Sequence, residues 1–243
     1  MNKIKLKEQK YEFGIIRSSR KTIGIIVNAD QKLIVRSPKR TSIRKIKSLL
    51  IKKEDWIIKK LTKMSEIKAP PKAKEFISGE TLLYLGKEYK LKLVAGTDLN
   101  VLKVNLEQDK VAVYYPAELE DNKENRKTAI REKLISWYRS QAKMKIKELI
   151  KMHKIHLDVE PNNIVIKKQK KRWGSCSSKK NLNFNWKIIM APLKVIEYLV
   201  VHELVHLIHS NHSKEFWQTV AEIIPDYEEK KEWLRINGRR LTI

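Results

Sequence analysis

The sequence predicts an α+β fold whose C-terminal half combines strands with a histidine-carrying helix. Short β-branched runs, separated by turn-prone residues, fill the first forty positions, and this pattern is typical of strands. Residues 121–154 instead repeat apolar side chains at helical spacing. After Pro192, an apolar segment carries four of the six histidines within eleven residues. Strands and helices therefore fall into separate groups along the chain, as in an α+β protein.

The N-terminal region, residues 1–67, is predicted to be a small α+β region of its own. The stretch "YEFGIIRSSRKTIGIIVNADQKLIVRSP" contains strand-like runs that "SSRK" and "NADQK" interrupt. From Thr41 to about Met64, apolar residues recur among lysines at helical spacing, with Thr41 or Ser42 as the cap. The double proline of "EIKAPPKAKEF" then ends the helix and marks a linker. We expect this region to pack onto the C-terminal half of the chain, to present a groove of that half, or to form a small recognition domain.

Residues 75–117 are predicted to form a region of β-hairpins. "LLYLGKEYKLKLVAG" turns at Gly86-Lys87, and "NVLKVNLEQDKVAVYYP" turns between Glu107 and Lys110. No internal repeat is visible in the sequence.

Residues 118–243 are predicted to form the catalytic core. The longest helix covers residues 121–154, and its apolar stripe includes Ile130, Leu134 and Ile146. The chain then returns to strand, and "NLNFNWKII" alternates apolar and polar residues. Pro192 opens the histidine-carrying helix. A last helix runs from about Ser213 to Ile236, with a break near Pro225.

The chain is strongly basic, and this charge has two interpretations. Lysine and arginine total 53 against 28 aspartates and glutamates, which gives a net charge of +25. Such an excess favours attraction to polyanions such as nucleic acid. The lysines are spread along the chain, however, and a genome rich in Ile, Lys and Asn codons would produce the same excess.

A cytoplasmic protein without a membrane partner is the simplest expectation. No run approaches the roughly eighteen apolar residues that a membrane helix needs. The N-terminus "MNKIKLKEQKYEF" alternates lysines with apolar residues, unlike a secretory signal. Cys176 is the single cysteine, which excludes an internal disulfide framework.

The segment His202-Glu203-Leu204-Val205-His206 has the pattern HExxH. Four residues on a helix turn through about 400°, so the two imidazoles lie one above the other, about 6 Å apart along the axis. Both can therefore bind one zinc ion at roughly 2.0–2.1 Å. Glu203 falls about 100° away, where it can act on a water molecule as a general base.

A catalytic zinc ion needs a third protein ligand and an open position. His209 lies about 10.5 Å from His202 along the same helix axis, too far for one tetrahedral ion. His212 is the better candidate, because Ser210-Asn211 can end the helix and let the chain turn back. Histidines that only hydrogen-bond within a packed helix are the alternative.

The motif and its neighbours resemble a known family. "HELVHLIHSNHSKEFW" is similar to the zinc-binding signature of the YgjP-like metallopeptidase family, predicted metal-dependent hydrolases related to the SprT-like zinc proteases. "KKRWGSCSSKKNLNFNW", "PDYEEKKEWL", "RKTIGIIVNADQKLIVRSP" and "KKEDWIIKKL" agree with it. The resemblance implies a zincin-like catalytic half and one zinc ion per chain. It also implies His202, His206 and His212 as ligands, with Glu203 as the catalytic acid and base.

The predicted function is zinc-dependent cleavage of peptide bonds, in which Glu203 takes a proton from the attacking water and returns it to the leaving amine. Arg172 and Tyr227 are candidates to stabilise the oxyanion; for Tyr227, helix packing is the other interpretation. Asn183 and Asn185 lie on a strand that is expected to add a substrate strand at a sheet edge, unless that strand is interior.

Two other functions stay open from the sequence. The protein would be nucleic-acid-associated if it were a SprT-like protease acting on DNA-bound proteins, or a binding module with structural zinc. A hydrolase for a non-peptide bond would use the same residues. Glu203 and the absence of a fourth protein ligand favour an enzyme over a structural site.

Overall fold

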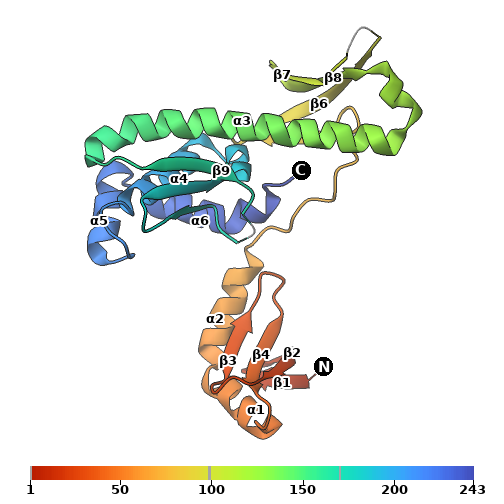
Figure 1. The fold of residues 1–243 in the computed structure, drawn as a ribbon. Coiled ribbons are helices and arrows are strands. Elements are labelled where there is room, and N and C mark those ends of the chain that lie inside the picture. Colours follow the sequence, from red (N-terminus) through yellow and green to blue (C-terminus); the bar gives the residue numbers. More distant parts are fainter. Residues whose placement is uncertain (1, 98–99, 170) are drawn as a thin grey trace. The chain divides into compact units, whose positions relative to one another are not determined.

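A computed structural model describes residues 2–97, 100–169 and 171–243. The chain divides into two compact units, Met1–Ala69 and Pro70–Ile243. Each unit combines sheet and helix (Figure 1), so the predicted α+β class is confirmed. None of the helices among the described residues has the length and apolarity needed to cross a bilayer.

The first unit is a four-stranded sheet covered on one face by two helices. Strands β1 (Asn2–Leu6), β2 (Gln9–Ser18), β4 (Leu33–Pro38) and β3 (Gly24–Val27) lie in that order, with β2 and β4 parallel. Helices α1 (Ile43–Lys52) and α2 (Glu54–Ser65) follow. The strand residues Phe13, Leu33 and Val35 are buried against Ile46 and Leu50 of α1. Every second residue of a strand and every third or fourth residue of a helix share one face, and the sequence indicates both spacings.

The predicted single helix from Thr41 to Met64 is wrong in one respect, because the chain breaks it into two. Lys53 has non-helical dihedral angles (φ −110°, ψ 17°) between α1 and α2. The Ser42 side chain accepts a hydrogen bond from the Lys45 amide at 3.2 Å, so Ser42, rather than Thr41, caps α1.

The second unit begins with another four-stranded sheet. Strands β5 (Thr81–Tyr84), β6 (Lys87–Gly96), β8 (Lys110–Pro116) and β7 (Lys103–Glu107) lie in that order, with β6 and β8 parallel. The order and the directions are the same as in the first unit. The sequence shows no repeat, yet the two sheets are built alike.

The first hairpin turns at Leu85-Gly86, one residue before the predicted position, and both residues have positive φ angles of 49° and 80°. The turn docks on the chain ahead of the histidine-carrying helix, where the amides of Leu85 and Gly86 bond the carbonyls of Ile189 and Met190. A Cβ on Gly86 would lie 2.7 Å from Pro192 Cα. Only glycine therefore permits this contact.

Helix α3 (Lys123–Leu157) follows a short 3₁₀ helix, η1 (Ala117–Asp121), and joins the two parts of the second unit (Figure 1). Its N-terminal half packs Ile130 and Leu134 against the four-stranded sheet. Its C-terminal half packs Ala142 and Ile146 into the core around the histidine-carrying helix. Asn122 caps it through the Asn125 amide at 3.0 Å.

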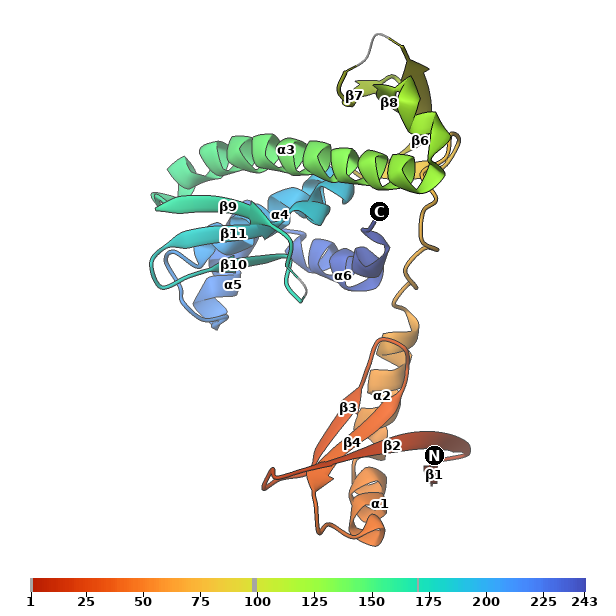
Figure 2. The ribbon, with the colours of Figure 1, turned by 45° about the vertical axis from the view of Figure 1, so that its right-hand side comes forward.

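The C-terminal part places a three-stranded sheet and several helices around the histidine-carrying helix. Strands β10 (Gly174–Cys176), β11 (Asn181–Asn185) and β9 (Asn163–Lys167) lie side by side, with β11 in the middle (Figure 2). The remaining elements are η2 (Trp186–Met190), α4 (Leu193–Val205), α5 (Lys214–Ile223), α6 (Tyr227–Asn237) and η3 (Gly238–Arg240).

Two predicted boundaries in this part change. The strand predicted to continue through Ile188 ends at Asn185, because the Asn185 side chain caps a 3₁₀ turn at the Lys187 amide. Successive residues Ile188, Ile189 and Met190 are then all buried, a pattern that alternation does not anticipate. The predicted last helix divides at Pro225 into α5 and α6, as the proline indicates.

Candidate metal centre

Helix α4 is buried on almost every side, which explains why its sequence is apolar nearly all round. It packs on α3, η2, β10, α5 and α6, and Val200, Val201 and Leu204 are fully buried. Pro192 is its N-cap. The missing N–H group of a proline costs nothing there, because the first N–H groups of a helix have no partner within the helix. The helix therefore holds its last turn, which carries His202 and Glu203, against packed neighbours.

The helix ends at Val205, and His206 is its C-cap. The sequence places this end later, at Ser210-Asn211, and that prediction is wrong. The amides of Leu207 and Ile208 bond carbonyls three residues back, at 2.9 and 3.0 Å, so the last turn tightens into a 3₁₀ pattern. The chain then reverses before Ser213, the N-cap of α5, and this reversal carries His212 back to the HExxH motif.

Three imidazoles meet at this point. His202, His206 and His212 each offer one ring nitrogen, and the three nitrogens lie within 4.8 Å of one another. The Nε2 atoms of His202 and His212 are 3.1 Å apart. His206 Nδ1 donates to the His209 carbonyl at 3.0 Å, so Nε2 is the ring nitrogen that could bind a metal ion. This is the arrangement in which a histidine is oriented as a metal ligand.

Two aromatic residues of α5 support the three imidazoles. The buried ring of Phe216 lies with its centroid 5.0, 4.6 and 4.8 Å from those of His202, His206 and His212. Trp217 stacks on His212 at 5.5 Å. The sequence shows Phe216 and Trp217 only as apolar residues of a helix, so their role beneath the histidines depends on the reversal before Ser213.

Burial favours the neutral form of two of the three histidines, His202 and His212. Burial lowers the pKa of His202 to about 3, and the neighbouring His206, His212 and Lys231 add to the effect. Burial also lowers the pKa of His212, again with His206 and Lys231 contributing. Neutral imidazoles are the form that binds a metal ion, so the donor set fits a cation such as Zn²⁺.

Glu203 lies beside the three histidines, and its side chain is almost fully buried. It is only 4% exposed, and burial raises its pKa to about 8, although the Arg172 charge lowers it. Its Oε2 is buried without a hydrogen-bond partner among the described residues. A buried carboxyl oxygen without a protein partner is a position for a water molecule or a substrate atom.

Strand β10 passes directly over this carboxyl group at Gly174. A Cβ built on Gly174 would lie 2.3 Å from Glu203 Oε1, so only glycine fits. Gly174 is a strand residue whose missing side chain makes room for Glu203, and no local sequence signal predicts this contact.

The motif opens into a cleft of about 610 Å³ that contains all three histidines, Glu203 and residues of β10. Arg172 lines this cleft, and its positive charge lowers the pKa of the Glu203 carboxyl group. Cys176 also lines the cleft and is half-buried. Burial, followed by the Glu203 charge, raises the pKa of its thiol.

Asn183 and Asn185 do not lie on a free sheet edge. Their strand, β11, pairs with β9 on one side and β10 on the other, so the prediction that it receives a substrate strand is wrong. Asn185 is buried, and its amide donates to the Gln169 carbonyl at 3.0 Å. The side chain of Asn183 donates to the Ser175 carbonyl at 3.4 Å. Strand β10 forms the outer edge on the side of the cleft.

Tyr227 stacks on Trp217, with ring centroids 5.0 Å apart and planes at 16°. It is therefore one ring further from the histidines than Trp217 is. His209 takes no part in the histidine group, and its Nε2 contacts Thr219 Oγ1 at 3.2 Å.

The two histidines of α3 differ from each other. His156 is exposed. His153 is buried, and its Nε2 contacts Glu197 Oε1 at 2.8 Å. It sits on the inner face of α3, where an imidazole needs a polar partner.

Comparison with known proteins gives one family and two solved structures. A family model described as "YgjP-like, metallopeptidase domain" matches residues 21–237. The metallopeptidase zymogen of Pyrococcus abyssi abylysin is similar over 40% of this chain and 99% of its own, with 20% identity and a TM-score of 0.37. The zymogen of Methanocaldococcus jannaschii jannalysin covers 35% of this chain and 92% of its own, with 27% identity and a TM-score of 0.32. The comparison with curated proteins gave no match.

Proposed function

The chain belongs to the YgjP-like metallopeptidase family, and from this premise we propose that it cleaves peptide bonds with one zinc ion and a glutamate base. The resemblance seen in the sequence is thereby confirmed, and a metal-dependent peptidase is what the family implies. The observation that carries the finer proposal is the meeting of three imidazoles with a buried glutamate in one cleft.

His202, His206 and His212 would hold the ion. Three nitrogen ligands suit Zn²⁺ and leave a coordination position open, as in catalytic rather than structural sites. When bound, the ion supplies Lewis acidity, which makes a water molecule more acidic and polarises a carbonyl group. The bond from His206 Nδ1 to the His209 carbonyl fixes the ring that would present Nε2 to the ion.

Glu203 moves the proton. Its carboxylate takes a proton from the attacking water, and the resulting carboxyl group gives it to the leaving amine. The burial of Glu203 supports both proton transfers, because it raises the pKa of the carboxyl group to about 8, close to neutral pH. Gly174 keeps the carboxylate in place from above.

Arg172 and strand β10 would bind the substrate. Arg172 lines the cleft beside Glu203, where a guanidinium can stabilise negative charge on the carbonyl oxygen. The edge of β10 can accept an extended peptide by backbone hydrogen bonds. Tyr227 is the weaker oxyanion candidate, because its ring is stacked on Trp217.

The experiment that tests this proposal compares Glu203→Gln with Glu222→Gln, an exposed glutamate of α5. Purified proteins would be loaded with zinc and assayed on casein and on a peptide library. We expect Glu203→Gln to bind zinc but to lose about 10²–10⁴-fold in cleavage rate, while Glu222→Gln stays active. Full cleavage by Glu203→Gln would refute the role of Glu203.

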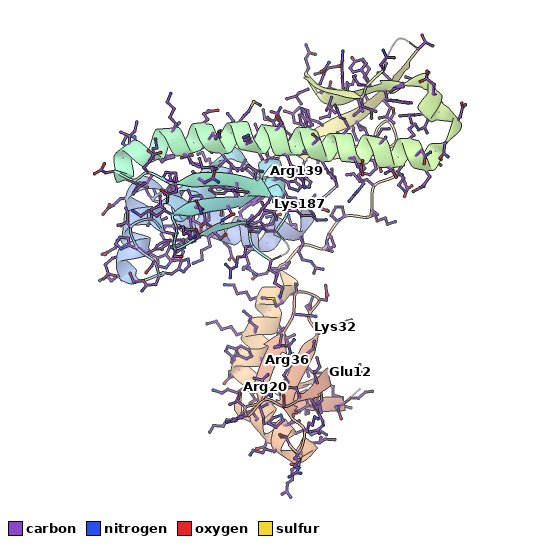
Figure 3. The ribbon with its side chains drawn as sticks, viewed as in Figure 1. Glu12, Arg20, Lys32, Arg36, Arg139 and Lys187 are labelled. Carbon is purple, nitrogen blue, oxygen red and sulfur yellow. The ribbon has the colours of Figure 1, made fainter. Side chains whose placement is uncertain are left out.

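A second candidate function, association with nucleic acid, is favoured by one segment of the first unit. Residues 31–53 contain nine lysines and arginines and no acidic residue, and all nine side chains are exposed. The segment contains β4 and the whole of α1 and ends at Lys53. Figure 3 shows Lys32 and Arg36 on this unit. Such a surface matches the spaced phosphates of a nucleic-acid backbone.

The test is the salt dependence of binding to labelled DNA and RNA, measured by fluorescence anisotropy. We expect the logarithm of the binding constant to fall linearly with the logarithm of salt concentration. The steepness of that line should decrease by about one for each phosphate contact removed. A triple change of Arg40, Arg44 and Lys47 to glutamine would reduce that slope. No binding, or a flat response to salt, would mean that the charge is only compositional.

A further inference from the structure

A second cavity, of about 440 Å³, lies next to the metal cleft, and we call it the basic pocket. Five cationic side chains from three separate segments line it: Lys171, Arg172, Lys187, Arg235 and Arg239. Its described lining includes no aspartate or glutamate. Lysine and arginine normally spread over a surface among acidic residues, so five around one hollow form a strong local field.

The basic pocket is continuous with the catalytic region through shared walls. Arg172 lines both the basic pocket and the cleft of the three histidines. Trp173, Leu234 and Arg235 line both the basic pocket and a smaller cavity of about 290 Å³, which His202 and Glu203 also line. Because successive Cα atoms are 3.8 Å apart, Arg172 and Gly174 are separated by at most about 7.6 Å. The basic pocket, which Arg172 lines, is thus only two residues along the chain from Gly174, the residue that contacts Glu203.

The wall between these cavities is firmly held. The Trp173 carbonyl accepts a hydrogen bond from the Asn185 amide at 2.7 Å. The Trp173 ring packs on Gly238, where a Cβ would lie 3.1 Å from it. The pocket is therefore a fixed feature of the second unit, ready to orient a bound group before any rearrangement.

Positive charge dominates the interior of the pocket. Lys187 extends from η2, beneath α3 in Figure 3, and its Nζ donates to Thr242 Oγ1 at 3.1 Å. Burial lowers the pKa of Lys187, and the charges of Lys168 and Arg131 lower it further. Arg235 donates from Nε to Glu232 Oε2 at 2.7 Å, so its charge is already balanced. The charge that attracts an anion is therefore that of Lys187 and Arg172. A cation held among other cations is stabilised by any anion that enters.

We propose that the basic pocket binds a carboxylate of the peptide substrate and so selects acidic peptides. The proposal rests on the peptidase function above, since carboxylates are the anions that a peptide carries. The planar guanidinium of Arg172 suits a carboxylate, and Lys187 adds a point charge. The carboxylate has two sources, an acidic side chain near the cleaved bond or the C-terminus of a short peptide.

The first experiment measures kcat and KM for matched peptides. One pair differs only in Glu against Gln near the cleaved bond, and another only in a free against an amidated C-terminus. We expect the enzyme to prefer the carboxylate member of one pair by about tenfold, the size of one charge-assisted hydrogen bond. The pair that shows the preference identifies the source of the carboxylate.

The variant Lys187→Met removes the charge and keeps the length of the side chain. It should reduce that preference to within about twofold of unity by raising KM for the acidic peptide alone. The control Lys179→Met changes an exposed lysine of the neighbouring loop that lines neither cavity, and it should keep the full preference. An active enzyme without preference, or an unchanged preference in Lys187→Met, would overturn the proposal.

A binding measurement separates this proposal from the peptidase function. Anisotropy of fluorescein-labelled acidic and neutral peptides would be recorded with Glu203→Gln protein, which does not need to turn over. Preferential binding of the acidic peptide that Lys187→Met abolishes would support the pocket even if the wild type cleaves no peptide. Equal binding of both peptides would overturn the pocket even if the wild type is an active peptidase.

Discussion

Replacing Gly174 with alanine should disable catalysis without disturbing the histidines. The added Cβ would lie 2.3 Å from Glu203 Oε1 and 2.7 Å from both Cγ and Cδ of the same residue. Non-bonded carbon and oxygen atoms pack at roughly 3.4 Å or more. The carboxylate must therefore retreat by about 1 Å, because its own helix α4 is packed on every side and the strand β10 is paired with β11.

A shift of this size has a large kinetic effect. A misplacement of about 1 Å in a catalytic group can reduce the rate about 10²-fold, which corresponds to about 2.7 kcal/mol in activation free energy. The three atoms nearest to the added Cβ all belong to Glu203. We therefore expect the zinc content of Gly174→Ala to equal that of the wild type, while kcat falls about 10²-fold.

The assay is the initial rate of peptide cleavage, measured alongside zinc content and the thermal unfolding midpoint. The matched control is Gly14→Ala on β2, where an added Cβ meets no atom within 4 Å. Gly14→Ala should keep the wild-type rate. The reasoning would be refuted if Gly174→Ala cleaved within about twofold of the wild type, or if it lost zinc together with activity.

Three further predictions concern the surroundings of the histidines. Phe216→Ala removes the buried ring beneath all three imidazoles and should lower the free energy of unfolding by about 3–5 kcal/mol in a denaturant titration; a change below about 1 kcal/mol would contradict the packing described. His209→Ala should keep its zinc, because His209 contacts His206 only through its backbone carbonyl, and metal loss measured by elemental analysis would show that the side chain matters. Chelation with 1,10-phenanthroline should abolish cleavage and lower the unfolding midpoint, and Zn²⁺ but not Mg²⁺ should restore both, since nitrogen ligands do not suit Mg²⁺. Restoration by Mg²⁺ would point to a different site.

The sequence predicts those features that depend on local pattern. Three such features are found in the structure: the spacing of His202 and His206, the cap at Ser42 and the break at Pro225. Each depends on only a few neighbouring residues of the sequence. Hydrophobic alternation likewise identifies strands. These signals reflect backbone hydrogen bonding and burial of one face, which neighbouring residues decide.

The features that the sequence misses depend on contacts between distant residues. Strand β11 lies in the middle of its sheet because β9 and β10 pair with it from both sides, and alternation cannot show which neighbours a strand will have. Gly174 is needed because Glu203, 29 residues later, comes within contact distance. His153 is buried because Glu197 of another helix faces it.

The similarity of the two four-stranded sheets is missed for a related reason. Strand order and direction are properties of pairing, and many sequences satisfy the same pairing as long as their buried positions alternate. Buried pairs lie across the parallel strands of both sheets, Phe13 with Leu33 in the first and Leu91 with Val111 in the second.

The most direct test of the account is the zinc content of purified protein, measured by elemental analysis for the wild type, His212→Ala and His156→Ala. His212 completes the group of three imidazoles, whereas His156 is an exposed histidine of α3. We predict one zinc ion per chain in the wild type and in His156→Ala, and weakened or absent zinc in His212→Ala. Wild-type protein that binds no zinc, or His212→Ala that binds it as tightly as the wild type, would contradict the proposed metal centre.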